Sequence, residues 1–183
     1  MNHAVLYVRD VARTTDFYTE ALDFRVVTSF PGAAFLQAPS STNDHDLGIF
    51  EVGADALPSD AGRRTVGLYH LAWEVETLGD LERLAGVLSD RKALVGASDH
   101  GTTKSLYAKD PDGLEFEVVW LIPAHLITEH DVRRKATTTR LDLDAEIERF
   151  GRDEISGVGI SVARPPVTTS PVLPTPATKG ATS

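Results

Sequence analysis

The sequence predicts an α+β fold in which two βαβββ modules form one half-open barrel, followed by a C-terminal extension. Three observations support this prediction. Strands and helices follow one another in the same order twice, a histidine opens the first strand of each copy, and the alternating pattern ends after Trp120. Two copies are too few for a solenoid, which needs at least three units, so closure of both copies around a shared curved sheet is the better interpretation.

The first module covers about residues 2–53. The segment "AVLYV" alternates as a strand does, and "DVARTTDFYTEALDF" then repeats apolar residues at helical spacing behind Asp10, a typical N-cap residue. Three further short strands are predicted for "FRVVTSF", "AAFLQAP" and "DLGIFEV", which are separated by a Pro-Gly pair and by a polar run. The order of this module is therefore βαβββ.

The second module covers about residues 67–121 and repeats that order. "LYHLAWEVE" predicts a strand, and "TLGDLERLAGVLSD" predicts a helix whose start carries a capping box formed by Thr77 and Asp80. "ALVGAS", "KSLYAKD" and "LEFEVVW" predict three more strands, and "DPDG" is the turn before the last of them.

Charged residues recur between the two copies. His70 lies 67 positions after His3, and Glu117 lies 66 positions after Glu51. A shift of 66 to 67 positions relates both pairs, so we interpret the two histidines as corresponding positions of the two modules.

The domain organisation follows from these patterns. We assign residues 1–124 to the paired modules and residues 125–157 to a partly helical extension that contains "LDLDAEIERF". Residues 158–183 are rich in Pro and Thr and have no periodic apolar face, so we expect this tail to be disordered.

The composition excludes several functional classes. The chain has 183 residues, no cysteine and a net charge of −9, which excludes disulfides and cysteine-bound metals and argues against nucleic acid as a partner. No segment approaches the roughly 20 apolar residues of a membrane span, and the N-terminus lacks the features of a signal peptide. We expect a cytoplasmic protein that binds neither nucleic acid nor membrane.

The repeated histidines predict a metal site. If His3 and His70 open corresponding strands, they can converge from the two modules, and Glu117 near the end of the last strand can join them. Two imidazoles and one carboxylate match the facial triad of non-haem Fe(II) enzymes and are also suitable ligands for Mn(II) or Zn(II). We predict that the half-open barrel surrounds this site.

The paired βαβββ modules, the two histidines and the segment "DPDGLEFE" together resemble the vicinal oxygen chelate superfamily. This superfamily includes glyoxalases, fosfomycin-resistance proteins and extradiol dioxygenases. The resemblance covers about residues 2–121 and implies the fold described above, with a divalent metal held by residues of both modules.

Two segments resemble the extradiol dioxygenase branch, in particular its single-domain, catechol 2,3-dioxygenase-like members. "NDHDLGIFE" is similar to the segment that carries the acid–base histidine, which implies this role for His45. "KSLYAKDPDGLEFE" is similar to the segment in which a tyrosine precedes the ligand glutamate by ten residues, as Tyr107 precedes Glu117. A further histidine followed by glycine precedes that tyrosine in the family, and His100 is its match.

The resemblance implies ring cleavage of a catechol-type aromatic diol with O₂, using Fe(II) or, as second choice, Mn(II). The residue types suit the chemistry, because His titrates near neutral pH and Tyr can donate to a metal-bound oxygen. Since single-domain members of the superfamily commonly pair, we also expect a homo-oligomer. Phe35, Trp73 and Trp120 either border the aromatic ring or fill the core.

Two alternatives remain open at this point. A glyoxalase-like lyase or isomerase would use four ligands, and the matching set would be His3, Glu51, His70 and Glu117. Such an enzyme moves protons with the help of a carboxylate and changes no metal oxidation state. A drug-binding resistance module of the same superfamily would need no metal and would leave the histidine pair without a role.

Overall fold

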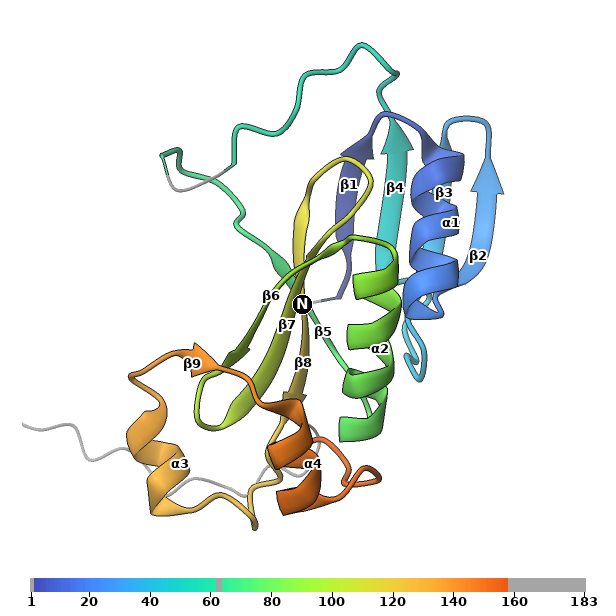
Figure 1. The fold of residues 1–183 in the computed structure, drawn as a ribbon. Coiled ribbons are helices and arrows are strands. Elements are labelled where there is room, and N and C mark those ends of the chain that lie inside the picture. The colour runs from blue at the N-terminus through green and yellow to red at the C-terminus, as the bar shows by residue number, and fades with distance from the viewer. Residues whose placement is uncertain (1, 62–63, 158–183) are drawn as a thin grey trace, which may run out of the picture.

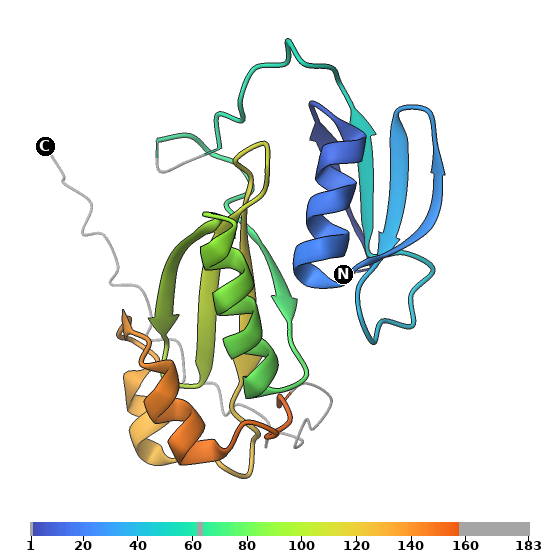
Figure 2. The same ribbon diagram turned by 45° about the vertical axis from the view of Figure 1, so that its right-hand side comes forward.

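The fold rests on two mixed sheets, one for each module, with helices on one side of each (Figures 1 and 2). The computed structural model describes residues 2–61 and 64–157, and the predicted tail at residues 158–183 lies outside them. The first module contains β1 (Ala4–Val8), α1 (Val11–Leu22), β2 (Arg25–Phe30), β3 (Ala33–Gln37) and β4 (Leu47–Glu51). The second contains β5 (Leu71–Glu74), α2 (Leu78–Asp90), β6 (Leu94–Asp99), β7 (Thr103–Lys109) and β8 (Glu115–Leu121).

The strand order is the same in both sheets. The first sheet has the order β1-β4-β3-β2, and the second has the order β5-β8-β7-β6 with a short strand β9 (Thr139–Arg140) added at its edge. The predicted α+β class and the repeated βαβββ order are therefore confirmed. The expected half-open barrel is not formed, because the two sheets remain separate and share no strand pairing in the described part of the chain.

The predicted helix starts are present. The Asp10 side chain accepts a hydrogen bond from the Arg13 backbone N–H at 2.9 Å, which caps the first turn of α1. Thr77 and Asp80 form the expected capping box of α2 through reciprocal hydrogen bonds. These local contacts satisfy backbone N–H groups that a helix leaves without a partner in its first turn.

Alternation along β1 and β8 shows that each sheet has a helix-covered face and an open face. In β1, Leu6 and Val8 are buried beneath α1, whereas Val5 and Tyr7 are exposed on the other face. In β8, the buried residues are Phe116, Val118 and Trp120. Trp120 is completely buried, so it belongs to the core and does not border a substrate.

The two modules share one core on their helix-covered faces. The Phe116 ring of the second module packs at 6.0 Å from Phe17 and 6.1 Å from Tyr18, both on α1. Phe24 and Trp73 add an edge-to-face contact at 5.1 Å. Because the two modules pack together through their helix-covered faces, the open faces of the two sheets do not meet.

The extension after β8 covers one end of the second module (Figures 1 and 2). It contains α3 (Glu129–Arg134), β9, which pairs with β6, and α4 (Leu143–Phe150). Within residues 2–61 and 64–157, no helix is both long enough and apolar enough to cross a bilayer.

Candidate active site

The two histidines that defined the repeat occupy equivalent places in the structure. His3 directly precedes β1, and His70 directly precedes β5. Counting along each strand in steps of two places both histidines on the open face, with Val5 in the first module and Ala72 in the second. The equivalence of the histidines therefore extends from the sequence to the sheet.

Glu51 and Glu117 are not equivalent in the structure, although their spacing in the sequence is close to that of the two histidines. Ala72 of β5 pairs with Glu117 of β8, and the corresponding residue Val5 of β1 pairs with Gly48 of β4. Gly48 is thus the structural counterpart of Glu117. Because Glu51 lies three positions beyond Gly48, and three is an odd number, it belongs to the opposite face of the sheet.

Glu51 has a structural contact on that opposite face. Its Oε2 accepts a hydrogen bond of 3.1 Å from the backbone N–H of Val11, the first residue of α1. A carboxylate at this position is stabilised by the partial positive charge of the helix N-terminus. The four-ligand set of the glyoxalase alternative therefore lacks its fourth member on the open face.

His70 and Glu117 lie together on the open face of the second module. His70 Nε2 is 3.0 Å from Glu117 Oε2, and the side chains are 24% and 13% exposed. Two ligand atoms each about 2.1 Å from one ion, at a right angle, would be separated by about 3 Å. These two of the three predicted ligands therefore fit a divalent metal in donor type and spacing.

Tyr107 and His100 stand beside this pair. Tyr107 of β7 is the cross-strand partner of Glu117, and its ring centroid lies 5.7 Å from that of His70. The Tyr107 hydroxyl is 2.9 Å from Nε2 of His100, the residue that follows β6. We name these four residues, His70, His100, Tyr107 and Glu117, the second-module cluster.

The environment keeps the Tyr107 hydroxyl protonated. Burial raises the pKa of Tyr107 to about 12, and the negative charge of Glu117 adds to this increase. Tyr107 therefore stays a neutral hydrogen-bond donor throughout the neutral pH range, as a group that stabilises a negatively charged oxygen must be.

His3 and His45 form a separate pair on the first module. Their ring centroids are 4.6 Å apart, and the His45 ring also makes a T-shaped contact with Phe35 at 5.0 Å between centroids. The His3 ring nitrogen Nδ1 lies 2.8 Å from the Asn2 side chain, and His45 Nδ1 lies 2.9 Å from Asp44. We name His3, His45 and Phe35 the first-module cluster.

The structure does not bring the two clusters into one site. Among the residues it describes, no three His, Asp or Glu side chains are close enough to hold a metal ion together. The physical reason is the shared core, which joins the modules through their helix-covered faces and leaves each cluster on its own open face. The ligand set of His3, His70 and Glu117 and the catalytic roles of His45, Tyr107 and His100 stay predictions.

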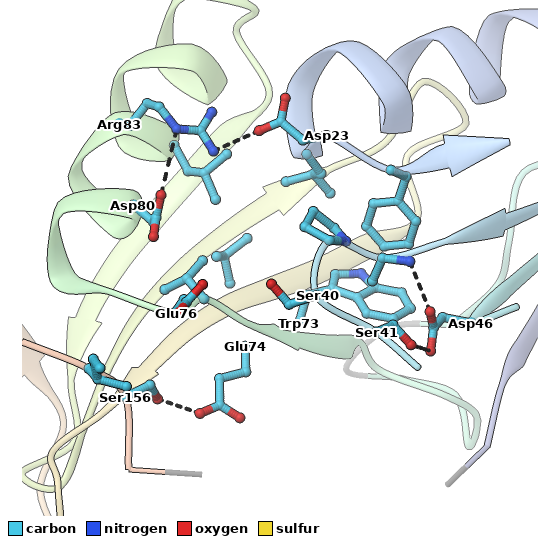
Figure 3. Close-up of a pocket in the computed structure, with 18 residues that line it drawn as sticks. Asp23, Ser40, Ser41, Asp46, Trp73, Glu74, Glu76, Asp80, Arg83 and Ser156 are labelled. Atoms are coloured by element: carbon cyan, nitrogen blue, oxygen red, sulfur yellow. Dashed lines mark hydrogen bonds and ion pairs between the residues drawn. The ribbon is translucent and has the colours of Figure 1, made fainter. Parts of the chain in front are cut away.

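A cleft of about 580 Å³ between the modules contains none of these residues (Figure 3). Trp73 and several carboxylates line it, but protein groups already satisfy the carboxylates that Figure 3 shows paired. Asp23 pairs with Arg83 at 2.8 Å, and Asp46 accepts hydrogen bonds from the Ala38 backbone and from Asn43 and Ser41 side chains. We assign this cleft no catalytic role.

Comparison with known proteins places the chain in a family. A family model described as the Glyoxalase/Bleomycin resistance protein/Dioxygenase superfamily matches residues 1–118. The chain belongs to this superfamily, which confirms the resemblance identified from the two modules and their histidines.

The more specific similarities are to proteins named as dioxygenases. The chain is 34% identical over 112 residues to Biphenyl-2,3-diol 1,2-dioxygenase 3 of Rhodococcus globerulus, covering 61% of this chain and 57% of that protein. It is 27% identical over 154 residues to Catechol-2,3-dioxygenase of Bacillus subtilis (strain 168), covering 82% and 52%. The chain thus spans just over half the length of these relatives.

A solved structure supports the fold. The glyoxylase/bleomycin resistance protein/dioxygenase domain from Frankia sp. EAN1pec aligns with a TM-score of 0.54 and 23% identity, covering 69% of this chain and 95% of that domain. At this identity the similarity establishes the fold alone.

One residue near the second-module cluster escaped the sequence analysis. Thr138 lies in the extension, and its hydroxyl oxygen is 3.2 Å from His100 Nδ1. It stands outside both repeats and outside every motif, so the sequence carried no signal for it.

Proposed function

We propose that the protein is a non-haem Fe(II)-dependent extradiol dioxygenase that cleaves the ring of a catechol-type aromatic diol with O₂. The observation that carries the proposal is the second-module cluster, in which a His–Glu pair stands beside a Tyr–His hydrogen-bonded pair. Similarity to relatives named as diol and catechol dioxygenases supports the same reaction class. A cytoplasmic location and the absence of nucleic-acid and membrane partners stay predictions.

The metal would be held by His70 and Glu117, with His3 as the third ligand. Fe(II), or Mn(II) in its place, would supply a centre that chelates both hydroxyl oxygens of the diol and supports the redox chemistry with O₂. The partly buried position of the pair suits this role, because reduced exposure to water strengthens the interaction between ligands and a cation.

The remaining side chains have proton-handling roles in this proposal. His45 takes a proton from a substrate hydroxyl, since a neutral imidazole is a competent base near pH 7. Tyr107 donates a hydrogen bond to a substrate oxygen, and His100 orients the Tyr107 hydroxyl through the 2.9 Å contact. Phe35, which packs against His45, offers an aromatic surface for the ring.

His3 must join the pair for the ligand set to be complete. Two arrangements would achieve this: closure of the two open faces within one chain, or donation of His3 by a second copy in the homo-oligomer expected from the sequence. Mixing His3→Ala chains with His70→Ala chains under conditions that allow subunit exchange distinguishes them. A shared site recovers up to about a quarter of the wild-type activity in a random 1:1 dimer mixture, whereas a site within one chain recovers none.

The glyoxalase alternative receives no support from the position of Glu51, which binds the N-terminus of α1 and lies on the wrong face. The metal-free binding module leaves the pairing of His70 with Glu117 without a function. We therefore retain the dioxygenase as the single candidate function.

The test is anaerobic reconstitution with Fe(II), followed by a screen of catechols for a yellow ring-fission product. We expect product only when Fe(II) and O₂ are both present, and no product from His70→Ala. Product formed in the absence of O₂ would exclude the dioxygenase. Isomerisation of a hemithioacetal by the Zn(II) or Ni(II) form would instead identify a glyoxalase.

A further inference from the structure

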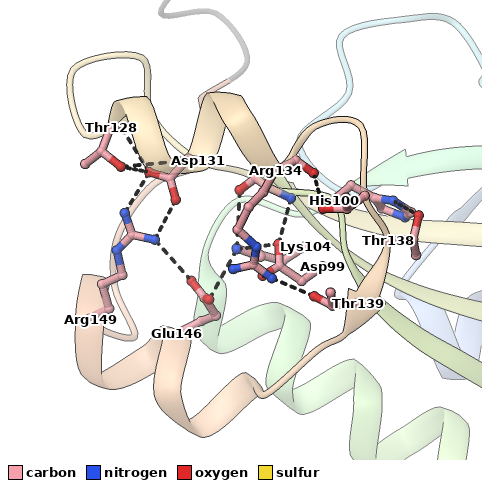
Figure 4. Close-up of polar contacts among 12 residues, drawn as sticks. Asp99, His100, Lys104, Thr128, Asp131, Arg134, Thr138, Thr139, Glu146 and Arg149 are labelled. Carbon is pink, nitrogen blue, oxygen red and sulfur yellow. Dashed lines mark hydrogen bonds and ion pairs between the residues drawn. The ribbon is translucent and has the colours of Figure 1, made fainter.

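We propose that the C-terminal extension positions His100 and that Thr138 is the residue through which it sets the hydrogen-bonding state of the imidazole. The inference rests on the proposed function, because it assigns His100 a place in that site. Figure 4 shows the residues that connect the extension to His100.

Both ring nitrogens of His100 have a partner. Nε2 lies 2.9 Å from the hydroxyl of Tyr107 on β7, and Nδ1 lies 3.2 Å from the hydroxyl of Thr138, the residue before β9. The imidazole therefore bridges the second-module cluster and the extension. A ring held at both nitrogens has its orientation defined by two hydrogen bonds.

The residue before His100 is fixed by the extension. Asp99 is 3% exposed, and its carboxylate contacts Lys104 Nζ at 2.7 Å and Arg134 of α3 at 2.9 Å. Asp99 also pairs with Thr139 of β9 across the sheet edge. These contacts fix the end of β6 directly before His100.

The residue after His100 is fixed by close packing. Gly101 has a φ of +81°, a conformation that favours glycine, and a Cβ built on it would lie 2.4 Å from the Asp131 carbonyl oxygen of α3. Only a residue without a side chain allows this approach. The glycine that follows His100 is therefore required by the extension.

Buried charges hold the extension in place. Lys104 is completely buried, and its Nζ lies 3.2 Å from Glu146 of α4 as well as 2.7 Å from Asp99. Arg149 of α4 pairs with both carboxylate oxygens of Asp131 on α3, at 2.8 Å and 2.7 Å. Such paired and hydrogen-bonded charges are strongly directional, so α3 and α4 have one preferred position against β6 and β7.

The donors and acceptors of the neighbouring groups give the direction of the two hydrogen bonds of His100. Before substrate binds, the Tyr107 hydroxyl donates its one hydrogen to its cross-strand partner Glu117, whose carboxylate can only accept. Tyr107 therefore accepts from His100, so Nε2 carries the hydrogen. In the neutral ring Nδ1 is then an acceptor, and the Thr138 hydroxyl is its donor. Thr138 thus favours the Nε2–H tautomer, the form in which His100 can orient the Tyr107 hydroxyl.

The test uses Thr138→Val, which removes the hydroxyl but keeps the branched shape, and Thr138→Ser, which restores the hydroxyl. Thr137→Val is the matched control, because the Thr137 hydroxyl bonds the Arg134 carbonyl and not the histidine. The first readout is ¹⁵N NMR of the histidine rings in the metal-free protein, with His100 assigned by the loss of its signals in His100→Gln. Circular dichroism checks that each variant is folded.

We expect the Nε2–H tautomer in wild type, Thr138→Ser and Thr137→Val, and a substantial Nδ1–H population in Thr138→Val. The second readout is catechol turnover by the Fe(II) enzyme. Thr138→Val should lower kcat by about 10- to 100-fold, as outer contacts of a site typically do, while metal content and KM stay unchanged and Thr138→Ser recovers most of kcat.

Unchanged His100 signals in Thr138→Val would overturn the inference. So would a changed tautomer with unaltered kcat, because Thr138 would then have no part in positioning for catalysis. Failure of the proposed function has a different signature: wild type itself would form no ring-fission product, while the NMR comparison would still report on the contact between Thr138 and His100.

Discussion

His70 and Glu117 meet on the open face of the second sheet, with Nε2 and Oε2 separated by 3.0 Å. His70 directly precedes β5, and Glu117 lies on β8, the parallel neighbour of β5. Pairing of the two strands therefore brings together residues that are far apart in the sequence. The contact is the geometric basis of the metal-site proposal and of the first prediction.

Removal of either member of this pair should abolish metal binding. In His70→Ala and Glu117→Gln, affinity for Fe(II) should fall by more than the roughly 10- to 100-fold that loss of an outer contact causes, because a ligand itself is lost. Glu51→Gln is the control, since Glu51 binds the N-terminus of α1. Metal analysis of anaerobically purified protein measures this, and equal occupancy in His70→Ala and wild type would refute the ligand assignment.

His45→Gln should separate catalysis from metal binding. The substitution keeps a polar side chain but removes the base, so we expect normal Fe(II) content and ring cleavage lowered by about 10²- to 10⁴-fold. Glu51→Gln should leave the rate within about twofold of wild type, since proton transfer in this site does not involve it. Catechol turnover that survives His45→Gln would rule out the acid–base role.

The raised pKa of Asp110 should make the stability of the protein depend on pH. Burial raises the pKa of Asp110 to about 6, although backbone N–H groups of Leu114 and Asp112 donate to its Oδ1. The other oxygen, Oδ2, is buried and has no partner among the described residues. The folded protein therefore resists ionisation of this group.

The sign of the effect follows from the raised pKa. Between about pH 4 and pH 6 the unfolded chain releases this proton and the folded chain retains it, so the free energy of unfolding falls as pH rises through this window. Asp110→Asn keeps the acceptor oxygen and stays neutral. By urea denaturation it should be more stable than wild type by up to about 3 kcal/mol at pH 8, and nearly equal to it at pH 4. A difference of the same size at both pH values would show that ionisation of Asp110 is not the cause.

A substitution of Lys104 tests how much the buried charges that hold the extension contribute to stability. Lys104→Met removes the cation and leaves Asp99 buried with fewer partners, so the free energy of unfolding should fall by about 3–5 kcal/mol. Arg133→Ala is the control, because Arg133 forms an exposed pair with Glu129 and should change stability by less than about 1 kcal/mol. Equal stability of Lys104→Met and wild type would mean that the buried charges contribute nothing.

Local patterns were sufficient for most of the fold. Asp10 and the capping box at Thr77 marked the helix starts, and alternation located the strands on both sides of α1 and α2. These signals come from residues that are close together in the sequence. Backbone N–H groups at a helix start need hydrogen-bond partners, and the spacing of apolar residues follows the period of the helix or strand. The predicted half-open barrel is not formed, because its formation depends on how the two modules pack against each other.

Spacing along the chain does not show which residues of the two modules correspond, as the carboxylates Glu51 and Glu117 illustrate. Glu51 and Glu117 are separated by nearly the same interval as His3 and His70, yet the strand registers make Gly48 the counterpart of Glu117. An interval in the sequence cannot resolve a shift of a few residues between two modules. In a strand, an odd shift moves a side chain to the opposite face.

The sequence by itself determined the order of elements, the repeat and the residue types from which a metal site can be made, because these depend on periodicity and local chemistry. Only the tertiary structure decided which of those residues meet. It placed His70 with Glu117 and Tyr107, kept His3 with His45 on a separate face, and brought Thr138 to His100 from outside both repeats. Contacts between distant segments arise from packing and register, and neither is encoded in the spacing of residues along the chain.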